Sequence, residues 1–468
     1  MAQAPAPLRL NKTQSLGRTG MTNMKIARAA LLAGLIAASL TGCKGGLFGG
    51  GDDKTTPTVG NRTPILSKIE KGTDVDPALA AISVVMPPAR ANAEWGQAGG
   101  SASKSYGHLA LSENPAKVWT ASVAGSTNRM RLAAAPVIGG GKLFAQGTDG
   151  AIVAHDKATG ARLWTRGEDG MTKDQAPSAF GGGVSYEAGK VYATNGVGDV
   201  KAMNADTGEV LWTVKPAGPL RGSPTIAFGQ LFVMTQDNQI ISLNINDGSL
   251  VWDESGSNTQ AGVFGVAAPA AGQGSIVAGY SSGELSAYRY ENGRTLWSDA
   301  LARTNISTTV GSITDIDADP IIDSGRVYAL GQGGRMAAYE LVTGQRIWEL
   351  NLAGISTPAI AGEWIFTLTD DARLLAIARS SGRVRWITQL QRFRDEEDKE
   401  GPIFWTGPVL AGGNLWVASS RGEVWKVSTG EGSSALFADL GQPVSLPPVV
   451  ADGMLYVLDD AGTIHAWK

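Results

Sequence analysis

The chain has 468 residues, 43% of them hydrophobic, with 40 basic and 43 acidic side chains and a formal net charge of −3. This balance, without a basic stripe, excludes the usual signature of a nucleic-acid-binding protein. A single cysteine has no disulfide partner within the chain. Three scattered histidines have no metal-ligand spacing, and we expect hydrogen-bonded structural roles for the two in repeat strands, His155 and His465. No Gly-x-Ser-x-Gly elbow or Walker loop is present, so we predict no catalytic residue, cofactor or metal.

The N-terminal region contains a secretion signal. Within residues 21–43, a short basic start precedes the mostly apolar residues 29–40, and small residues follow. This apolar run is too short to span a bilayer and is typical of a cleaved signal peptide. Met21 and Met24 are alternative starts, because the preceding residues add nothing that a signal needs. We predict a signal peptide over residues 1–42.

The end of this signal indicates a lipid anchor. The sequence Leu-Thr-Gly-Cys at 40–43 resembles the bacterial lipobox, in which a signal peptidase cuts before an acylated cysteine. Cys43 stands where the apolar run ends, which favours lipidation over a chance cysteine near an ordinary cleavage site. Lys44 follows, and Lys rather than Asp at this place is compatible with export to the outer membrane. We therefore expect a protein anchored by lipid to the outer membrane and facing the periplasm.

Three segments follow the signal. Residues 43–64 are rich in Gly, Thr and Asp and have little to bury, so we expect a flexible tether. Residues 65–110 have a mixed composition to which the sequence assigns no structure, although the stretch 77–90 is apolar enough to dock on another part of the protein. Residues 111–468 contain an internal repeat.

The repeat is built around a heptapeptide with a Gly and, four residues later, a Trp. It occurs six times between residues 158 and 386, as ATGARLW, DTGEVLW, NDGSLVW, ENGRTLW, VTGQRIW and SSGRVRW. In each of these units a branched apolar residue precedes the Trp by 21 positions. The unit that opens at Pro177 contains an insertion around residues 180–183, and in the unit that opens at Pro408 either Leu436 or Phe437 replaces the Trp.

Each unit has the pattern of four short strands separated by Asp and Gly turns. The heptapeptide Gly suits a turn position with positive φ. Units of about 40–50 residues with four strands apiece are typical of propeller blades. The last unit, which opens at Pro448, lacks its fourth strand, and the strand-like residues 117–123 have no preceding strands of their own. We predict an all-β, eight-bladed propeller whose ring closes when this N-terminal strand pairs with residues 463–468.

The repeated Trp invites either a functional or a structural interpretation. A Trp in every blade cannot meet a single ligand, whereas packing between neighbouring sheets explains its recurrence. We therefore assign the heptapeptide to the architecture, and the function has to lie elsewhere.

The repeats that end in Trp164 and Trp212 resemble the tryptophan-docking motif of quinoprotein repeats, known from dehydrogenases that use pyrroloquinoline quinone. The chain has no adjacent cysteine pair and no CxxCH haem motif, and it is shorter than those enzymes. With its lipobox, tether and eight blades it resembles instead the BamB family, lipoproteins of the outer-membrane β-barrel assembly machinery. That resemblance implies a non-enzymatic scaffold that binds the periplasmic POTRA repeats of the barrel-inserting subunit. A quinoprotein dehydrogenase and a scaffold of another envelope complex stay as alternatives.

The resemblance also implies partner-binding residues on two inter-blade loops. In residues 218–225, Leu220 and Arg221 match the end of the family's Leu-x-Leu-Arg-Gly run, and we expect an exposed Leu beside the Arg. Gly218 stands where the family has its first Leu. In a second loop, Asp315 and Asp317 match the family's acidic pair, although two such carboxylates also suit a cation or a turn cap. Both loops are expected on the same face of the ring, where Arg221 and an Asp could pair.

A charged insertion, residues 391–401, follows the Trp386 strand. Such runs are usually solvated loops, and Phe393 among the charges keeps a docking role open. Nascent outer-membrane proteins are a further expected partner, received at strand edges or concave faces by β-augmentation.

Overall fold

The computed structural model describes residues 73–167, 178, 180–220, 222–257, 267–301 and 314–468. These residues belong to one compact unit, Ile69–Lys468. The predicted signal peptide, the lipidation site Cys43 and the tether lie outside the described residues, as does Arg221. Within the described ranges, no helix has the length and hydropathy needed to cross a membrane.

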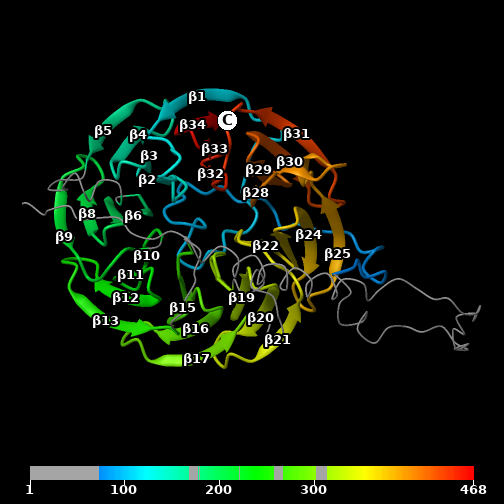
Figure 1. Ribbon diagram of the computed structural model, residues 1–468, viewed down its shortest axis with the longest axis horizontal. Helices are drawn as coiled ribbons and strands as arrows, with labels where there is room; N and C mark the ends of the chain where they lie inside the picture. Colours follow the sequence, from blue (N-terminus) through cyan, green and yellow to red (C-terminus); the bar gives the residue numbers. More distant parts are fainter. Residues whose placement is uncertain (1–72, 168–177, 179, 221, 258–266, 302–313) are drawn as a thin grey trace, which may run out of the picture. The chain divides into compact units, whose positions relative to one another are not determined.

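Eight four-stranded antiparallel sheets are arranged around a ring (Figure 1), so the predicted eight-bladed propeller is confirmed. In each blade the first strand lies at the centre and the last at the rim. Blades 1 to 4 consist of β2 (Val137–Gly139), β3 (Lys142–Gln146), β4 (Ile152–Asp156) and β5 (Arg162–Arg166); β6 (Gly182–Glu187), β7 (Lys190–Asn195), β8 (Val200–Asn204) and β9 (Val210–Val214); β10 (Thr225–Ala227), β11 (Gln230–Met234), β12 (Gln239–Asn244) and β13 (Leu250–Ser255); and β14 (Ala270–Gly272), β15 (Ser275–Gly279), β16 (Glu284–Arg289) and β17 (Thr295–Ala300).

The second half of the ring repeats this order. Blades 5 to 7 consist of β18 (Ile321–Asp323), β19 (Arg326–Gly331), β20 (Arg335–Glu340) and β21 (Arg346–Leu350); β22 (Ala359–Ala361), β23 (Trp364–Leu368), β24 (Arg373–Ala378) and β25 (Val384–Gln389); and β28 (Trp405–Ala411), β29 (Asn414–Ser419), β30 (Glu423–Ser428) and β31 (Ser434–Asp439). Blade 8 contains β32 (Val449–Ala451), β33 (Met454–Leu458), β34 (Thr463–Trp467) and, from the other end of the chain, β1 (Lys117–Ser122).

Blade 8 closes the ring as the sequence predicts. Strand β1 pairs antiparallel with β34, with Trp119 opposite Ala466 and Ser122 opposite Thr463. The two chain segments that complete this blade come from opposite ends of the propeller, so the pairing removes the free edges that an incomplete blade would leave inside the ring.

The heptapeptide joins each blade to its neighbour. The Gly has a φ near +70°, and a Cβ on it would collide with the Trp of the preceding blade; on Gly344 it would lie 2.4 Å from Cγ of Trp297. The Trp indole N–H also donates to a backbone carbonyl of the next blade in the pairs Trp119–Lys157, Trp164–Ala205, Trp252–Tyr290, Trp297–Leu341, Trp348–Arg379 and Trp386–Thr429. The repeated Trp is therefore a structural contact between blades.

The degenerate unit in blade 7 uses Phe437 for this role. The Phe437 ring packs edge-on against Trp416, with ring centroids 4.9 Å apart, and also against Trp467 of blade 8. Leu436 is 52% exposed. The spacing alone left the choice between these two residues open, and the packing resolves it.

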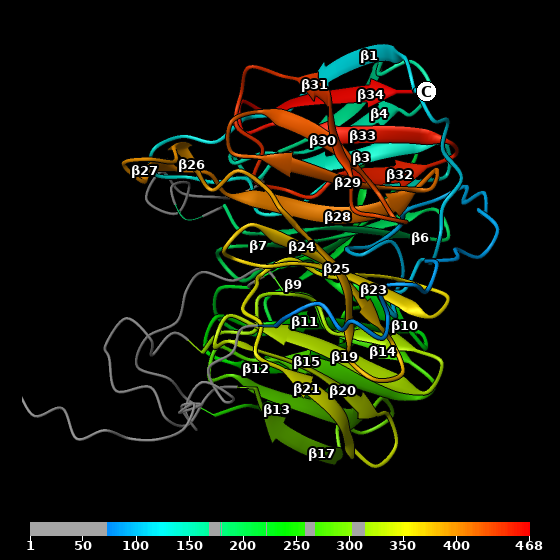
Figure 2. The same cartoon turned by 90° about the vertical axis from the view of Figure 1, so that its right-hand side faces the viewer.

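Residues 73–116, which we call the N-terminal hub, cross one face of the ring and hydrogen-bond to all eight blades (Figure 2). Trp95 exchanges two backbone hydrogen bonds with Ile138 of blade 1, and Leu109 bonds to Leu410 and Gly412 of blade 7. The contacts with blades 2 to 6 and 8 are Gly96 with Tyr186, Gln97 with Ile226, Ala102 with Ala271, Ser103 with Ile322, Asp76 with Val384 and Asn92 with Val450 and Asp452. These bonds lie at or beside the turns that join the first and second strands, except in blade 6, where Asp76 contacts the start of the last strand.

Candidate partner-binding face

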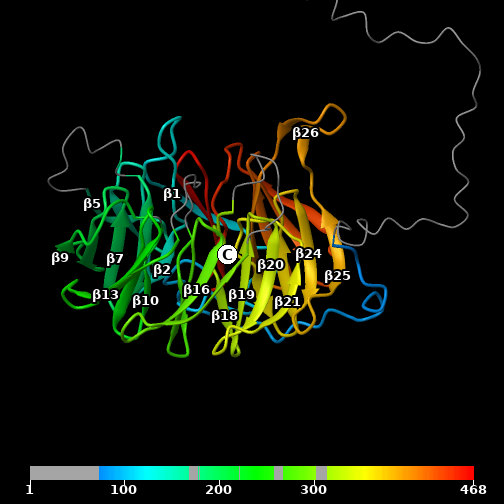
Figure 3. The same ribbon diagram turned by 60° about the horizontal axis from the view of Figure 1, so that its bottom comes forward.

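The face opposite the hub carries the connections between successive blades, and we call it the open face. In the two side views the hub and the hairpin β26 (Phe393–Asp395)–β27 (Glu400–Pro402) lie on opposite sides of the disc (Figures 2 and 3). The loops that contain Leu220 and Asp315 both join a last strand to the next first strand, and this connectivity gives them the same face. The structure therefore brings the two predicted loops to one side of the ring.

Leu220 does not have the expected exposure. Its side chain is only 1% exposed, it packs in a cluster with Leu231 and Val233, and its backbone pairs with Thr235 in an isolated bridge. The prediction of an exposed Leu beside an Arg is wrong at this position, because the loop bends inward to extend the edge of blade 3. Leu220 holds the loop in place, while Arg221 lies outside the described residues.

Asp315 and Asp317 flank Ile316, and all three side chains are buried. Ile316 packs between blades 4 and 5, and the Asp315 carbonyl accepts a hydrogen bond from the Gln332 N–H at 2.9 Å. Both aspartates have further interactions within the protein. Asp317 borders a cavity that Ser223 of the first loop also borders, so the two loops reach the same central opening.

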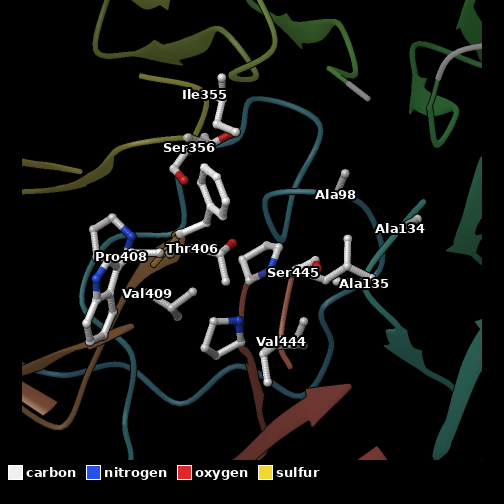
Figure 4. Close-up of a pocket in the computed structure, with 18 of the residues that line it drawn as sticks. Ala98, Ala134, Ala135, Ile355, Ser356, Thr406, Pro408, Val409, Val444 and Ser445 are labelled. Carbon is white, nitrogen blue, oxygen red and sulfur yellow. The ribbon is translucent and has the colours of Figure 1, made fainter. Parts of the chain in front are cut away.

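The central opening leads into a cavity of about 590 Å³. Figure 4 shows how separate loops surround it, with Ile355, Thr406, Val444 and Ala135 on different sides. Trp95, Ala98, Gly99 and Tyr106 of the hub also line it, and the Trp95 and Tyr106 rings are 4.9 Å apart. Because the hub lies against the opposite face, we describe the cavity as the open-face end of the propeller channel.

Sequence reasoning missed this cavity. The available signal was the proline that opens a unit, which marks the start of a blade in the sequence but does not indicate that several such prolines meet. Several of these prolines line the cavity, together with others in the loops before blades 7 and 8: Pro136, Pro402, Pro408, Pro443, Pro447 and Pro448.

A buried charged pair lies beside the cavity. The Lys104 ammonium donates to the Ala98 carbonyl at 3.0 Å and to the Thr225 hydroxyl at 3.1 Å. Burial lowers the pKa of Lys104 to about 8, against the opposing attraction of Asp319. Burial likewise raises the pKa of Asp319, against the opposing effect of Lys104 and of the Ala268 N–H, which donates to this carboxylate at 2.7 Å. The hub thus places a cation at the centre of the ring, close to an acidic residue of the open face.

The charged insertion forms the β26–β27 hairpin rather than an irregular loop. Its base is attached to blade 7 by the Trp405 indole N–H, which donates to the Gln391 carbonyl at 2.8 Å, and by the Arg421 side chain, which donates to the Gln391 side chain at 3.0 Å. The tip residues Glu396 to Lys399 are exposed. The hairpin projects from the open face, and its residues Arg394 and Pro402 border the cavity.

The lining of the cavity does not fit pyrroloquinoline quinone. This cofactor is a polyanion, whereas the lining has the guanidinium groups of Arg131 and Arg394 against three carboxylates, Asp317, Asp319 and Asp460. Among the described residues, no group of His, Cys, Asp and Glu could hold a metal ion. His155 Nδ1 lies 3.1 Å from the Gly160 carbonyl, and His465 Nε2 lies 2.9 Å from the Asp459 carboxylate, as expected for structural histidines.

The fold and the repeat together define a β-propeller of the quinoprotein-repeat class, with a hub on one face and an open cavity on the other. The sequence model described as outer membrane protein assembly factor BamB matches residues 101–173 and 148–388. The chain therefore belongs to the BamB family, as its sequence predicts.

Individual proteins agree with this assignment. The outer membrane protein assembly factor BamB of Yersinia pestis is 26% identical over 358 residues, covering 76% of this chain and 89% of the relative. That of Escherichia coli K12 is 26% identical over 356 residues, covering 75% and 88%. The crystal structure of BamB from Moraxella catarrhalis has a TM-score of 0.62 at 18% identity, covering 75% of this chain and all of the other (100%). A quinohemoprotein alcohol dehydrogenase from Comamonas testosteroni reaches the same TM-score, 0.62, at 13% identity over 80% of each chain, which shows a shared fold alone.

Proposed function

We propose that this protein is a non-enzymatic scaffold lipoprotein of the machinery that assembles β-barrel proteins in the outer membrane. The observation that carries this proposal is the match to the BamB family over most of the propeller. The open face supports it, because several inter-blade loops and a hairpin present a broad surface there while the hub covers the other face. No bond-making step belongs to this function.

The anchor supplies proximity to the membrane. In this proposal, Cys43 carries lipid in the inner leaflet of the outer membrane, and the propeller faces the periplasm. Roughly 30 residues separate Cys43 from Thr73, and a coil of that length spans about 30 Å. The Thr73 hydroxyl donates to the Asn351 carbonyl, so the described chain begins at the rim between blades 5 and 6. A partner would be met close to the membrane surface, which raises its effective concentration.

The partner in this proposal is the barrel-inserting subunit, bound through its periplasmic POTRA repeats. Arg221 would make the direct contact, because its guanidinium group combines planar donors with an apolar stem. Leu220, being buried, would fix the loop from below. Asp315 and Asp317, which are buried beside Ile316, would shape the second loop.

The first test is a mild-detergent pull-down of the tagged, lipidated protein from outer membranes, with mass spectrometry of the bound proteins. We expect recovery of the barrel-inserting subunit. Recovery of an unrelated envelope complex, or of a quinone chromophore without the barrel subunit, would favour one of the alternatives and overturn the scaffold proposal.

A charge reversal then tests the loop. Arg221→Glu should strongly reduce co-purification of the barrel subunit, while the matched control Arg294→Glu, at an exposed turn of blade 4 near the hub face, should not. Leu220→Ala is no clean probe of binding, because truncating a buried Leu costs about 2–5 kcal/mol of folding free energy. Unchanged co-purification of the Arg221 variant would exclude this site.

A further inference from the structure

The cavity on the open face has the composition of a binding site for an apolar group. Ala, Pro, Val and aromatic side chains dominate its lining, and its volume of about 590 Å³ falls within the range typical of ligand pockets. Proline has no backbone N–H, so the proline-rich loops before blades 7 and 8 offer few donors to a ligand. A polar ligand would lose hydrogen bonds to water on entering this space.

The charges around the cavity favour a neutral occupant. The lining contains Arg131 and Arg394 against Asp317, Asp319 and Asp460. Lys104, which bonds to the carbonyl of the lining residue Ala98, adds a further positive charge close to Asp319. Positive and negative groups therefore nearly balance, and neither a polyanion nor a polycation finds a complementary field.

The apolar surface continues beyond the cavity. Phe404 is 68% exposed and Ile355 is 48% exposed, and both border the opening. The Phe404 backbone is held in place, because its N–H bonds to the Ser420 hydroxyl and its carbonyl accepts from the Ser420 N–H. A small molecule inside the cavity would leave these two side chains in water. A peptide with one side chain in the cavity and its backbone across the opening would cover them.

The hub closes the inner end of the cavity. Trp95 and Tyr106 line its inner end, and the backbone of Trp95 is tied to blade 1 by two hydrogen bonds of 2.8 Å. An occupant entering from the open face meets aromatic rings at the inner end. Aromatic pairs contribute about 0.5–1.5 kcal/mol beyond the burial of their area, so an aromatic side chain suits this end.

We propose that this cavity binds an aromatic side chain of an extended, uncharged peptide segment, of the kind found in the unfolded transmembrane strands of outer-membrane barrels. Such strands alternate apolar and polar residues and carry aromatic girdles at both membrane interfaces. This assignment rests on the proposed function for the source of the peptide. That the occupant is aromatic and uncharged is inferred from the lining of the cavity alone.

The test is a fluorescence anisotropy titration with the full chain in phospholipid nanodiscs and no other protein. The probe is a labelled peptide of about ten residues, the length of one barrel strand, with Tyr and Val alternating with Ser and Thr. A second peptide has Ser in place of each Tyr. We expect saturable binding of the first peptide and at least about fivefold weaker binding of the second, as for the loss of a side chain that dominates an interface.

Three variants locate the site. Phe404→Ala should weaken binding of the Tyr peptide at least about fivefold, and Ala135→Trp, which fills the cavity, should abolish saturable binding. Phe228→Ala is the matched control, since Phe228 is 42% exposed on a turn at the hub face. Thermal unfolding of each variant excludes a folding defect, and the exposed Phe404 site keeps the test valid even where Ala135→Trp fails to fold.

Equal affinity of both peptides, or equal binding by the Phe404 and Phe228 variants, would overturn the proposal, as would the absence of saturable binding. Because the titration contains no barrel subunit, its failure would leave the pull-down result unaffected. Conversely, the protein could bind the Tyr peptide and yet fail to recover the barrel subunit in the pull-down. The cavity would then still be a site for an aromatic side chain, but the proposal that the peptide comes from outer-membrane barrel strands would be overturned.

Discussion

The two faces of the ring are built from the same blades but are used differently. On the hub face, backbone and side-chain atoms of one N-terminal segment hydrogen-bond to every blade, and a buried Lys reaches the centre of the ring. On the open face, the loops between blades surround a cavity, with Phe404 and Ile355 exposed beside it. The hub face contributes to stability, and the open face is the one that we propose for binding. Substitutions should therefore affect unfolding on one side and binding on the other.

The largest loss of stability should come from removing a Trp that packs between two blades, a contact that belongs to neither face. Trp297→Ala removes a buried side chain and its hydrogen bond to the Leu341 carbonyl, and we expect a loss of about 3–5 kcal/mol in the free energy of unfolding. Denaturant unfolding measures this loss. Val342→Ala, at a nearby exposed position, should change it by about 0.5 kcal/mol or less. Equal, small effects would contradict the structural role of the Trp.

The buried Lys104 predicts a pH effect on the hub side. Its pKa is lowered to about 8 in the folded protein from an ordinary value of 10.5. Between these values the unfolded chain binds a proton that the folded chain has lost, so the free energy of unfolding should rise with pH. The rise should reach roughly 3 kcal/mol over the window.

Chemical denaturation between pH 7 and 10.5 checks this prediction against Lys104→Met, which lacks the titrating group. Asp319, the neighbouring carboxylate, stays ionised in the unfolded chain throughout this range and does not titrate there. The same pH profile in both proteins would exclude a desolvated Lys104 at the centre of the ring.

A smaller loss of stability is expected when one contact between the hub and a blade is removed. The Gln97 side chain donates to the Ile226 carbonyl at 3.0 Å and accepts from the Ile226 N–H at 2.8 Å. Gln97→Ala leaves both buried backbone groups without these bonds, which should cost about 1–3 kcal/mol. Ser445→Ala removes an exposed hydrogen bond to Asp460 on the open face, and its cost should be about 0.5 kcal/mol or less. Thermal or denaturant unfolding measures the loss of stability in both variants. A larger loss for Ser445→Ala than for Gln97→Ala would contradict the proposed difference between the two faces.

The smallest effect is expected at the hairpin. Replacing residues 395–400 by Asn-Gly shortens it with a turn that suits two paired strands. Because the replaced residues are exposed and the base contacts of Gln391 remain, stability should change by about 0.5 kcal/mol or less. The pull-down should still recover the barrel subunit. A lost complex would assign the hairpin a docking role.

The repeat made most of the fold predictable. The Trp spacing located the blades, and the missing strand after Thr463 required β1 to close the ring. The hub was not predictable in the same way, because most of its contacts are backbone hydrogen bonds, and none of them follows a sequence period. Leu220 was misjudged for a related reason. A Leu in a loop has the same sequence signature whether it points to solvent or, as here, turns inward beside Thr235.

The cavity needed the whole ring to be assembled. Its lining comes from loops near residues 134, 317, 355, 406 and 445, together with the hub. No local pattern relates these stretches, since they meet only after every blade is in place. The prolines within them were visible, but their common location was not.

The hub can complete its contacts only after the C-terminal blades have formed. Its residues precede every blade in the chain, yet their final bonds include groups in blades 7 and 8, such as Leu410 and Asp452. Strand β1 likewise cannot pair until β34 is present, and the last residue of β34 is Trp467. Such long-range pairings are slow to form. A chain that stops short of β34 would lack the partner of β1 and part of the hub contacts, so a truncated protein should be cleaved by added protease faster than the complete chain.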